Sequence, residues 1–380
     1  MADAEVGDVV KLTWPAQKIE KIVMRVTAVD LGAPTDGAVR LTLIQDVFGV
    51  FQSFYTTGSE AQWQKPSFDP VDVTRYDFIE APAILTPSQT TRSILIAAEK
   101  PVAGRDFRLQ AKGGSEGSWV DAGVQQFTPL CFLSQALTAN QFFEDEVELG
   151  GDVGELDEYT SEEVRSGLGL LLVSSVSGFE WISYESVSRY GSGSASVGVV
   201  NRGLFNTKPV SHPVGARVWA VSEGFAVTPW QYAAGDAVGV KMLVGTQTGR
   251  QAFEDAALRS FTVGARNDQP WTPGRVRVNG HEGGFISGPA TITWRRRDGG
   301  APAVVFHGDD VSYGSSMTRI VVKSGGGVVK EVTGIDGESW VLDDELALNG
   351  GGYFGDLVFE VYSQSYGSSD SAPAVTYASR

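Results

Sequence analysis

The segment Asn201–Val221, NRGLFNTKPVSHPVGARVWAV, places a tight turn before a strand. Gly203 interrupts the preceding run, and the side chains of Asn206 and Thr207 can hydrogen-bond the backbone of a turn. Prolines then fix the chain as it leaves the turn. The segment therefore predicts local β structure and does not have the pattern of a catalytic loop.

The end of this segment has the alternation of a strand. Residues 216–221 place Arg217 and Trp219 on one predicted face and apolar residues on the other. His212 precedes the strand, between a serine and a proline. No nucleophile or acid stands at a supporting spacing, so we expect His212 to be a hydrogen-bonded spacer rather than a catalyst.

The composition around this segment is that of an all-β protein with many turns. The chain has 380 residues, enough for two or three domains with separate cores, and 46 of them are glycine. The formal net charge of −16 repels phosphate backbones, so direct nucleic-acid binding is not expected. This acidic balance suits solubility or a cationic partner surface.

Redox, metal and membrane chemistry have little support in the sequence. Cys131 is the only cysteine and there are three histidines, so we expect no disulfide, no metal site and no cofactor. Cys131 lies in an apolar run and is expected to be a small buried hydrophobe. The N-terminus lacks the pattern of a secretory signal, and the apolar run at 168–173 is too short to span a bilayer. We expect synthesis in the cytosol and an exterior location only within an assembled particle.

Residues 1–80 predict a small β domain. Three alternating runs with Gly, Pro and Asp between them form a meander, which needs more strands or a neighbour to cover its edges. An aromatic stretch rich in proline and aspartate, Phe48–Tyr55 and then Trp63–Phe78, is expected to be a linker. The strands are expected at Gly7–Trp14, Ile22–Val29 and Ala38–Val47.

Residues 81–268 predict a middle β domain. Ser93–Ala98 has the pattern of a buried strand, and Phe107–Ala122 that of a hairpin. Residues 144–163 contain ten acidic residues in twenty, which favours a solvated loop. A calcium site is the alternative, although the EF-hand ligand order is absent. A glycosidase carboxylate pair is less favoured, since such groups stand on rigid strands.

Residues 269–380 predict a β-sandwich. The strand-like runs recur every eight to twelve residues, and the lack of a cysteine pair favours a fibronectin type III variety over an immunoglobulin domain. The basic run Arg295–Arg297 is divided between the two faces of a strand, which favours an interface role over nucleic-acid contact. The segment His307–Asp310 is expected to be a turn rather than a cation site.

The sequence resembles the tail-tip proteins of siphophages and gene transfer agents, also called hub or host-specificity proteins. The resemblance rests on Arg202-Gly203-Leu, Thr207, His212, Gly215-Ala-Arg217 and the aromatic strand with Trp219. The pieces TITWRRRD, RIVVKSGGGVV and LVFEVYSQS, which include Trp294 and Arg295, resemble the fibronectin-like domain that ends these proteins. The order GDVVKL, MRVTAVD, RLTLIQDVFGV resembles the end of their hub β domain.

This resemblance implies a structural protein of the hub or baseplate, without catalytic activity. It implies three copies in the assembled tail, contacts with other tail-tip and baseplate proteins, and a receptor on the host surface. Much more hub usually precedes this point, so a separate polypeptide is expected to supply it. The resemblance also implies that Trp294 is a buried core residue.

The alternative is a carbohydrate-binding or carbohydrate-cleaving protein, because exposed tryptophans on β-sandwiches stack on sugars and the chain has nine. Trp14, Trp181 and Trp294 fall in strand patterns, where core packing is the simpler explanation. The tryptophans in loop-like sequence, which the alternative requires for binding, are Trp63, Trp230 and Trp271.

Overall fold

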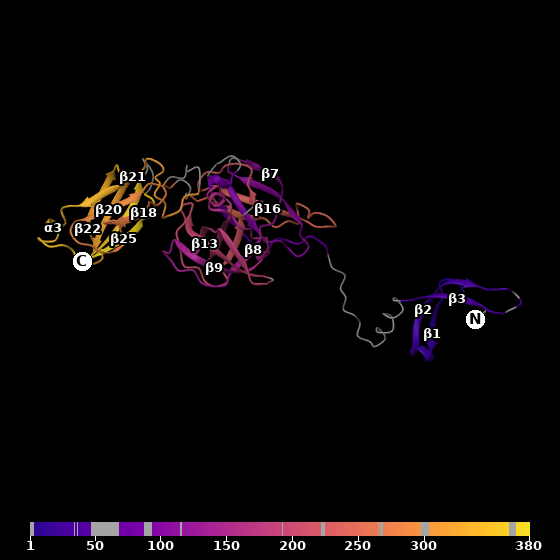
Figure 1. Cartoon of the computed structure of the whole chain (residues 1–380). Coiled ribbons are helices and arrows are strands. Elements are labelled where there is room, and N and C mark those ends of the chain that lie inside the picture. The colour runs from indigo at the N-terminus through magenta and orange to yellow at the C-terminus, as the bar shows by residue number, and fades with distance from the viewer. Residues whose placement is uncertain are drawn as a thin grey trace. The chain divides into compact units, whose positions relative to one another are not determined.

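In the computed structural model of the chain, β-strands are the predominant secondary structure (Figure 1). The chain forms two compact units, Met1–Pro66 and Ser67–Arg380. Within the described residues, no helix combines the length and the apolar character that a membrane span requires. The described residues are 4–33, 35, 37–46, 68–86, 93–114, 116–191, 193–221, 225–264, 266, 269–297, 304–364 and 370–380.

The first unit contains a three-stranded antiparallel sheet in the order β1-β2-β3, as the meander pattern predicts. Its strands are β1 (Val9–Trp14), β2 (Ile19–Asp30) and β3 (Arg40–Gln45), with a 3₁₀ turn at Pro15–Gln17. Trp14 is 54% exposed, so the expectation of core packing for this residue is wrong. A three-stranded sheet has no second layer against which such a ring can pack.

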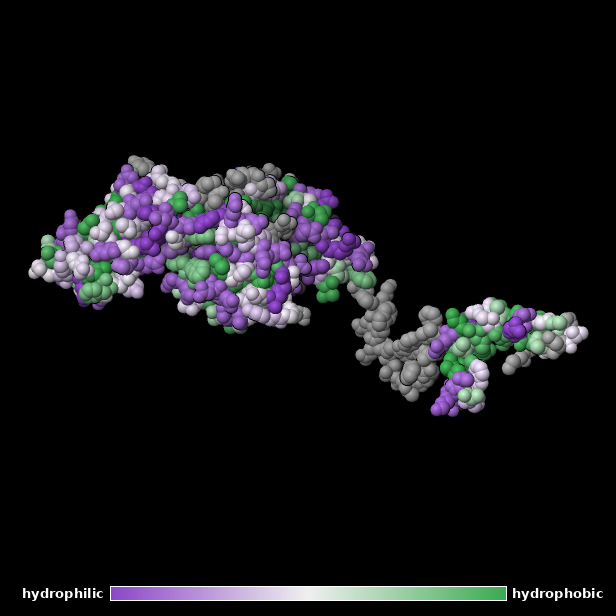
Figure 2. Space-filling model, in the orientation of Figure 1, coloured by the Kyte–Doolittle hydropathy of each residue, from purple (hydrophilic) through white to green (hydrophobic). Residues whose placement is uncertain are grey.

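One face of this sheet, which we call the N-terminal apolar face, consists of aliphatic residues and methionine except for Gln45, which lies opposite Met24. Cross-strand register aligns Val10 with Met24 and Val26 with Leu43. Only Val26 among the hydrophobic residues described here is fully buried. Figure 2 shows hydrophobic residues gathered at the surface of this unit. The members of the face are Val10, Leu12, Ile22, Met24, Val26, Val29, Leu41 and Leu43.

The second unit is centred on a small six-stranded barrel. Its sheet runs β11-β10-β14-β8-β9-β13-β12, and an additional pairing of β11 with β13 closes the barrel and leaves β12 outside. Interior positions alternate with outward ones, as barrel geometry requires. The strands are β8 (Leu130–Leu133), β9 (Phe143–Gly151), β10 (Leu170–Ser175), β11 (Gly178–Ser183), β12 (Ser186–Arg189), β13 (Ser194–Leu204) and β14 (Arg217–Val221).

Both faces of the barrel wall are buried. Cys131, Val147 and Val218 lie in an interior core, whereas Trp181 and Trp219 lie in a second core on the outside. The expectations for Cys131 and Trp181 are therefore confirmed, since both side chains are fully buried. The outer core needs covering layers, and neighbouring sheets provide them.

The acidic segment 144–163 is not a loop over its whole length, which corrects the prediction. Its first part belongs to β9, and it also contains a 3₁₀ turn at Val153–Glu155 and most of helix α2 (Ser161–Arg165). Val147 and Leu149 alternate with glutamates and face the barrel interior. Period-two alternation thus outweighs charge density, because the carboxylates lie on the solvent side of the strand.

Two further sheets pack beside the barrel and enclose a third core. One runs β15-β5-β4 and the other β17-β16-β6-β7. They confirm the predicted strand at 93–98 and the hairpin at 107–122, but β4 lies largely within the predicted linker. The strands are β4 (Tyr76–Glu80), β5 (Ile94–Ala98), β6 (Asp106–Gly113), β7 (Glu116–Gln125), β15 (Ala226–Val227), β16 (Ala237–Gly245) and β17 (Arg259–Thr262), with a 3₁₀ turn at Ala83–Leu85.

The C-terminal part is a two-sheet β-sandwich. The sheet β18-β20-β23 packs against β19-β25-β24-β21-β22, which is a fibronectin type III-like arrangement. Trp294 is 1% exposed in its core, as expected. The elements are β18 (Gly274–Val278), β19 (Gly284–Phe285), β20 (Ala290–Arg295), β21 (Met317–Ser324), β22 (Gly327–Ile335), β23 (Ser339–Leu342), α3 (Glu345–Leu348), β24 (Asp356–Gln364) and β25 (Ala374–Ser379).

Candidate functional site

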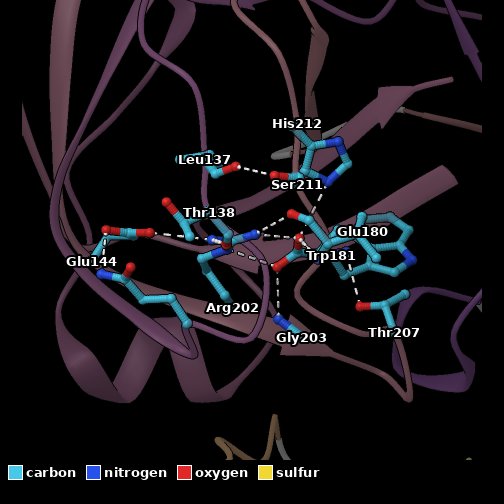
Figure 3. Close-up of polar contacts among 12 residues, drawn as sticks. Leu137, Thr138, Glu144, Glu180, Trp181, Arg202, Gly203, Thr207, Ser211 and His212 are labelled. Carbon is cyan, nitrogen blue, oxygen red and sulfur yellow. Dashed lines mark hydrogen bonds and ion pairs between the residues drawn. The ribbon is translucent and has the colours of Figure 1, made fainter. Parts of the chain in front are cut away.

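The barrel holds a buried charged side chain, that of Arg202, near the C-terminal end of β13 (Figure 3). All five of its N–H donors have acceptors. Nε and Nη2 donate to the two carboxylate oxygens of Glu180 at 3.0 and 2.8 Å. The other donors reach the carbonyls of Thr138 and Val210 and a carboxylate oxygen of Glu144. A guanidinium with every donor satisfied is fixed in orientation.

Glu180, on β11, is equally saturated and has no exposed side-chain surface. Besides Arg202, its oxygens accept the backbone N–H groups of Gly203 and Val210 at 3.1 and 3.2 Å. They also contact Nε2 of His212 at 3.2 Å. A buried carboxylate requires this many partners, because burial without them is costly. Glu180 thereby connects β11 to both ends of the segment that follows β13.

His212 lies between an acid and a hydroxyl. Its Nε2 faces Glu180, and its Nδ1 lies 2.9 Å from Oγ of Ser175, at the end of β10. A proton on Nε2 satisfies the carboxylate, which leaves Nδ1 to accept from Ser175 in the neutral ring. This order of groups is that of a nucleophile, base and acid. The imidazole has no exposed surface, however, and Glu180 is engaged by Arg202, so the arrangement fixes the loop.

Thr207, Gly203 and Gly215 shape the turns around this cluster. Oγ1 of Thr207 donates to the carbonyl of Leu204 at 2.6 Å and accepts the N–H of Trp181 at 3.1 Å. Gly203 has φ of +71°, and a Cβ there would lie 2.9 Å from the Pro209 ring. Gly215 also has positive φ, at +81°. These positions tie the turn to β11 and leave no room for a larger residue at 203.

Arg217 and Trp219 point to a different acid, Asp77 on β4. Arg217 donates to one oxygen of Asp77 at 2.9 Å, and Nε1 of Trp219 donates to the other at 2.6 Å. The two residues share one strand face, as the alternation predicts. Asp77 therefore joins the sheet of β4 to the barrel wall.

Replacing Asp77 by alanine is expected to lower the free energy of unfolding by about 2 kcal/mol, because it leaves the buried indole N–H of Trp219 without an acceptor. Urea titration followed by tryptophan fluorescence measures this change. Asp77→Asn keeps one acceptor and should cost less. A loss for Asp77→Ala no greater than that for Asp77→Asn would contradict this role.

Trp294 and Arg295 lie in the sandwich and do not join the barrel cluster. Arg295 pairs with Asp310 at 2.6 Å and Glu338 at 3.3 Å. Its neighbour Arg296 pairs with Asp336, and Arg297 is buried, where desolvation lowers its pKa to about 10. The predicted strand alternation does not hold beyond Arg295, where β20 ends.

The turn at His307–Asp310 connects the sandwich to the barrel. Asp309 forms a bidentate pair with Arg165 at 2.8 Å for both bonds, and His307 stacks on Phe142 with ring centroids 3.6 Å apart. Among the residues with described placement, no group of three or more His, Cys, Asp or Glu side chains is arranged to hold a metal ion. Burial raises the pKa of the Cys131 thiol to about 12.

The sequence did not identify Glu180 or Asp77 as partners of the predicted residues. Glu180 does carry a signal: it is a single carboxylate between Phe179 and Trp181 in a strand whose later residues are all buried. Asp77 is likewise a single carboxylate between two aromatic residues, Tyr76 and Phe78, but it lies 140 residues from Arg217, so the sequence does not indicate its partner.

The loop-like tryptophans are not all exposed. Trp230 packs against the core of the two neighbouring sheets, and Trp271 against the outer core of the barrel. Trp63 lies outside the described residues. The stacking role expected of Trp230 and Trp271 in a carbohydrate-binding protein therefore has no support from their packing.

Comparisons with known proteins leave the family open. No family model matches the chain, and no curated protein matches it. Among solved structures, it is similar to the FN1–FN3 domains of chicken CNTN1, with 11% identity and a TM-score of 0.19 over 82% of this chain and all of that one. It is also similar to fibronectin(III)-like modules of Clostridium thermocellum CbhA, with 10% identity and a TM-score of 0.18 over 66% of this chain and 93% of that one. Because these TM-scores are so low, the description of the fold rests on the strand arrangement of the chain and not on these similarities.

Proposed function

We propose that the chain is a structural component of a bacteriophage tail tip, in the hub or baseplate, and acts in tail assembly and host attachment. The proposed partners are other tail-tip and baseplate proteins, three copies of the chain in the assembled tail, and a host surface receptor. The family resemblance of residues 201–221 and of the C-terminal sandwich motivates this identity.

The observation that carries an assembly role is the N-terminal apolar face. Three strands with one apolar face are marginal in water unless a further layer covers that face. Val10, Leu12 and Leu43 are all only partly buried in the described structure. A covering surface supplied by another subunit would remove this apolar area from water and so stabilise both partners.

The buried cluster around Arg202 is consistent with a scaffold. Its hydrogen bonds join β11, β13 and the loop that contains Val210, and every donor of the guanidinium is used within the chain. Such saturated networks rigidify a fold. A rigid barrel suits a protein that holds its partners in fixed positions rather than one that performs chemistry.

Immunogold electron microscopy of intact particles, with antibody raised against this chain, tests the proposal. We expect gold at the end of the tail distal to the capsid. Gold absent from particles, with the chain free in the lysate, would overturn the assignment. An antibody against a capsid protein serves as the positional control.

A further inference from the structure

A groove lies on the outer face of the sheet β17-β16-β6-β7, away from the core that the inner face covers. Its volume is about 330 Å³. At its centre, Gly239 pairs with Lys112 on one side and with Ser260 on the other. The lining residues are Lys112, Gly113, Gly117, Ala237, Val238, Gly239, Leu258 and Ser260.

The floor of the groove depends on Gly239. A Cβ at this position would lie 3.3 Å from side-chain carbons of Lys112 and 3.4 Å from Cδ1 of Leu258. A larger side chain would therefore occupy the space between these two walls. The backbone of Gly239 does not require glycine for its φ angle, so its small size is the feature that the groove uses.

One wall is cationic and rests on aromatic rings. The Lys112 ammonium lies 5.0 Å from the centroid of Trp119, which contacts Phe253 edge to face at 5.2 Å. Lys241 lies 4.2 Å from the centroid of Phe253 and donates to its carbonyl at 2.6 Å. These contacts hold both lysine stems on the same outer face.

Lys112 is available for a ligand. No carboxylate among the described residues forms an ion pair with it, although the chain carries a net charge of −16. An ammonium group at the rim of a groove, placed over an aromatic ring and without a counter-ion, attracts an anion. The opposite wall offers an exposed aliphatic side chain, Leu258, and the hydroxyl of Ser260.

We propose that this groove binds an anionic saccharide unit, with its carboxylate or sulfate on Lys112. This inference rests on the proposed role in host attachment and names the chemistry of the receptor. A flat glycine floor admits a sugar ring, Leu258 can pack on its C–H face, and Ser260 can hydrogen-bond its hydroxyls. The volume is at the small end for ligand sites, which favours one or two rings over a folded peptide.

The test is binding of the purified full chain to an array of acidic and neutral glycans, followed by titration of the best acidic oligosaccharide. We expect acidic glycans to bind preferentially and more weakly as salt rises. Lys112→Gln should weaken binding about tenfold or more, since it removes a charged hydrogen-bond donor. Gly239→Val should weaken it at least as much by filling the floor.

Matched controls separate the groove from general effects. Lys100→Gln removes one exposed lysine elsewhere and should leave affinity unchanged. Thermal melting verifies that each variant folds. Binding to no glycan, equal binding to neutral glycans, affinity unaffected by both groove variants, or groove-dependent binding to acidic peptides alone would each overturn the proposal. Gold labelling of particles is independent of this assay, so the groove and the tail-tip assignment can fail separately.

Discussion

Replacing Arg202 by methionine is expected to lower the free energy of unfolding by about 3–5 kcal/mol, because it leaves the buried carboxylate of Glu180 without its main counter-charge. The carbonyls of Thr138 and Val210 would lose their donor at the same time. Lysine at position 202 has three donors instead of five and a different shape, so Arg202→Lys should recover only part of the loss. Urea unfolding followed by the fluorescence of the buried tryptophans measures both variants.

Two further variants test the reason for this loss. Arg202→Met combined with Glu180→Leu removes the unpaired charge and should be more stable than Arg202→Met alone. Arg108→Met breaks an exposed pair with Asp121 and should change stability little. If Arg202→Met cost no more than Arg108→Met, the buried pair would not hold the barrel.

The all-β fold follows from alternation that is visible in short segments. Residues 216–221 and 93–98 carry enough apolar residues at the right spacing for the strand to be expected from the sequence. The buried position of Trp294 also follows, in this case from the resemblance of its strand to a fibronectin-like domain. Local pattern suffices here because the side-chain period of a strand is two.

Segment 144–163 was predicted incorrectly because two signals overlap there. Glu146 and Glu148 face solvent while Val147 and Leu149 face the barrel, so the charges hide a strand with one buried face. The pairing of β11 with β13, which closes the barrel, could not be predicted from the sequence either. Its register shifts at a β-bulge between Trp181 and Ile182. Such bulges leave no mark in the spacing of apolar residues.

The candidate site was recovered only in part, because its acids are distant in sequence. Arg202 and His212 occur in one motif, but the carboxylate that unites them belongs to another strand 22 residues earlier. For Asp77 and Trp219 the separation is 142 residues. A sequence motif thus indicates which residues take part in a buried hydrogen-bond network. Their acidic partners come from distant strands and are identified only by the tertiary structure.

Acid is expected to weaken the contact between the barrel and the sandwich at His307. Burial, with a smaller contribution from the positive charge of Arg297, lowers the pKa of His307 from 6.5 to about 3. The unfolded chain therefore takes up a proton below pH 6.5 that the folded chain refuses until about pH 3. Stability from the neutral ring is complete above pH 6.5 and falls by up to about 1.4 kcal/mol for each pH unit between these values.

His307→Phe should remove this part of the acid sensitivity, because it keeps a ring against Phe142 and cannot take up a proton. Thermal melting between pH 4 and pH 7 compares the variant with the parent chain, and His281→Phe, at an exposed position, is the matched control. An unchanged pH profile in His307→Phe would contradict the assignment.

We expect the acid-induced loss of structure to begin at the contacts of His307 and Asp309, before the whole fold opens. His307 and Asp309 connect a sandwich segment to Phe142 and Arg165 of the barrel region, whereas the sandwich core around Trp294 is built from apolar side chains. Burial raises the pKa of Asp309, but the hydrogen bonds from Arg165 and from the N–H of Phe306 together with nearby positive charge lower it overall, so this pair also weakens in acid. Hydrogen exchange at pH 4 should therefore open the amides of Val304 and Phe306 before those of β20, because only the former depend on these contacts.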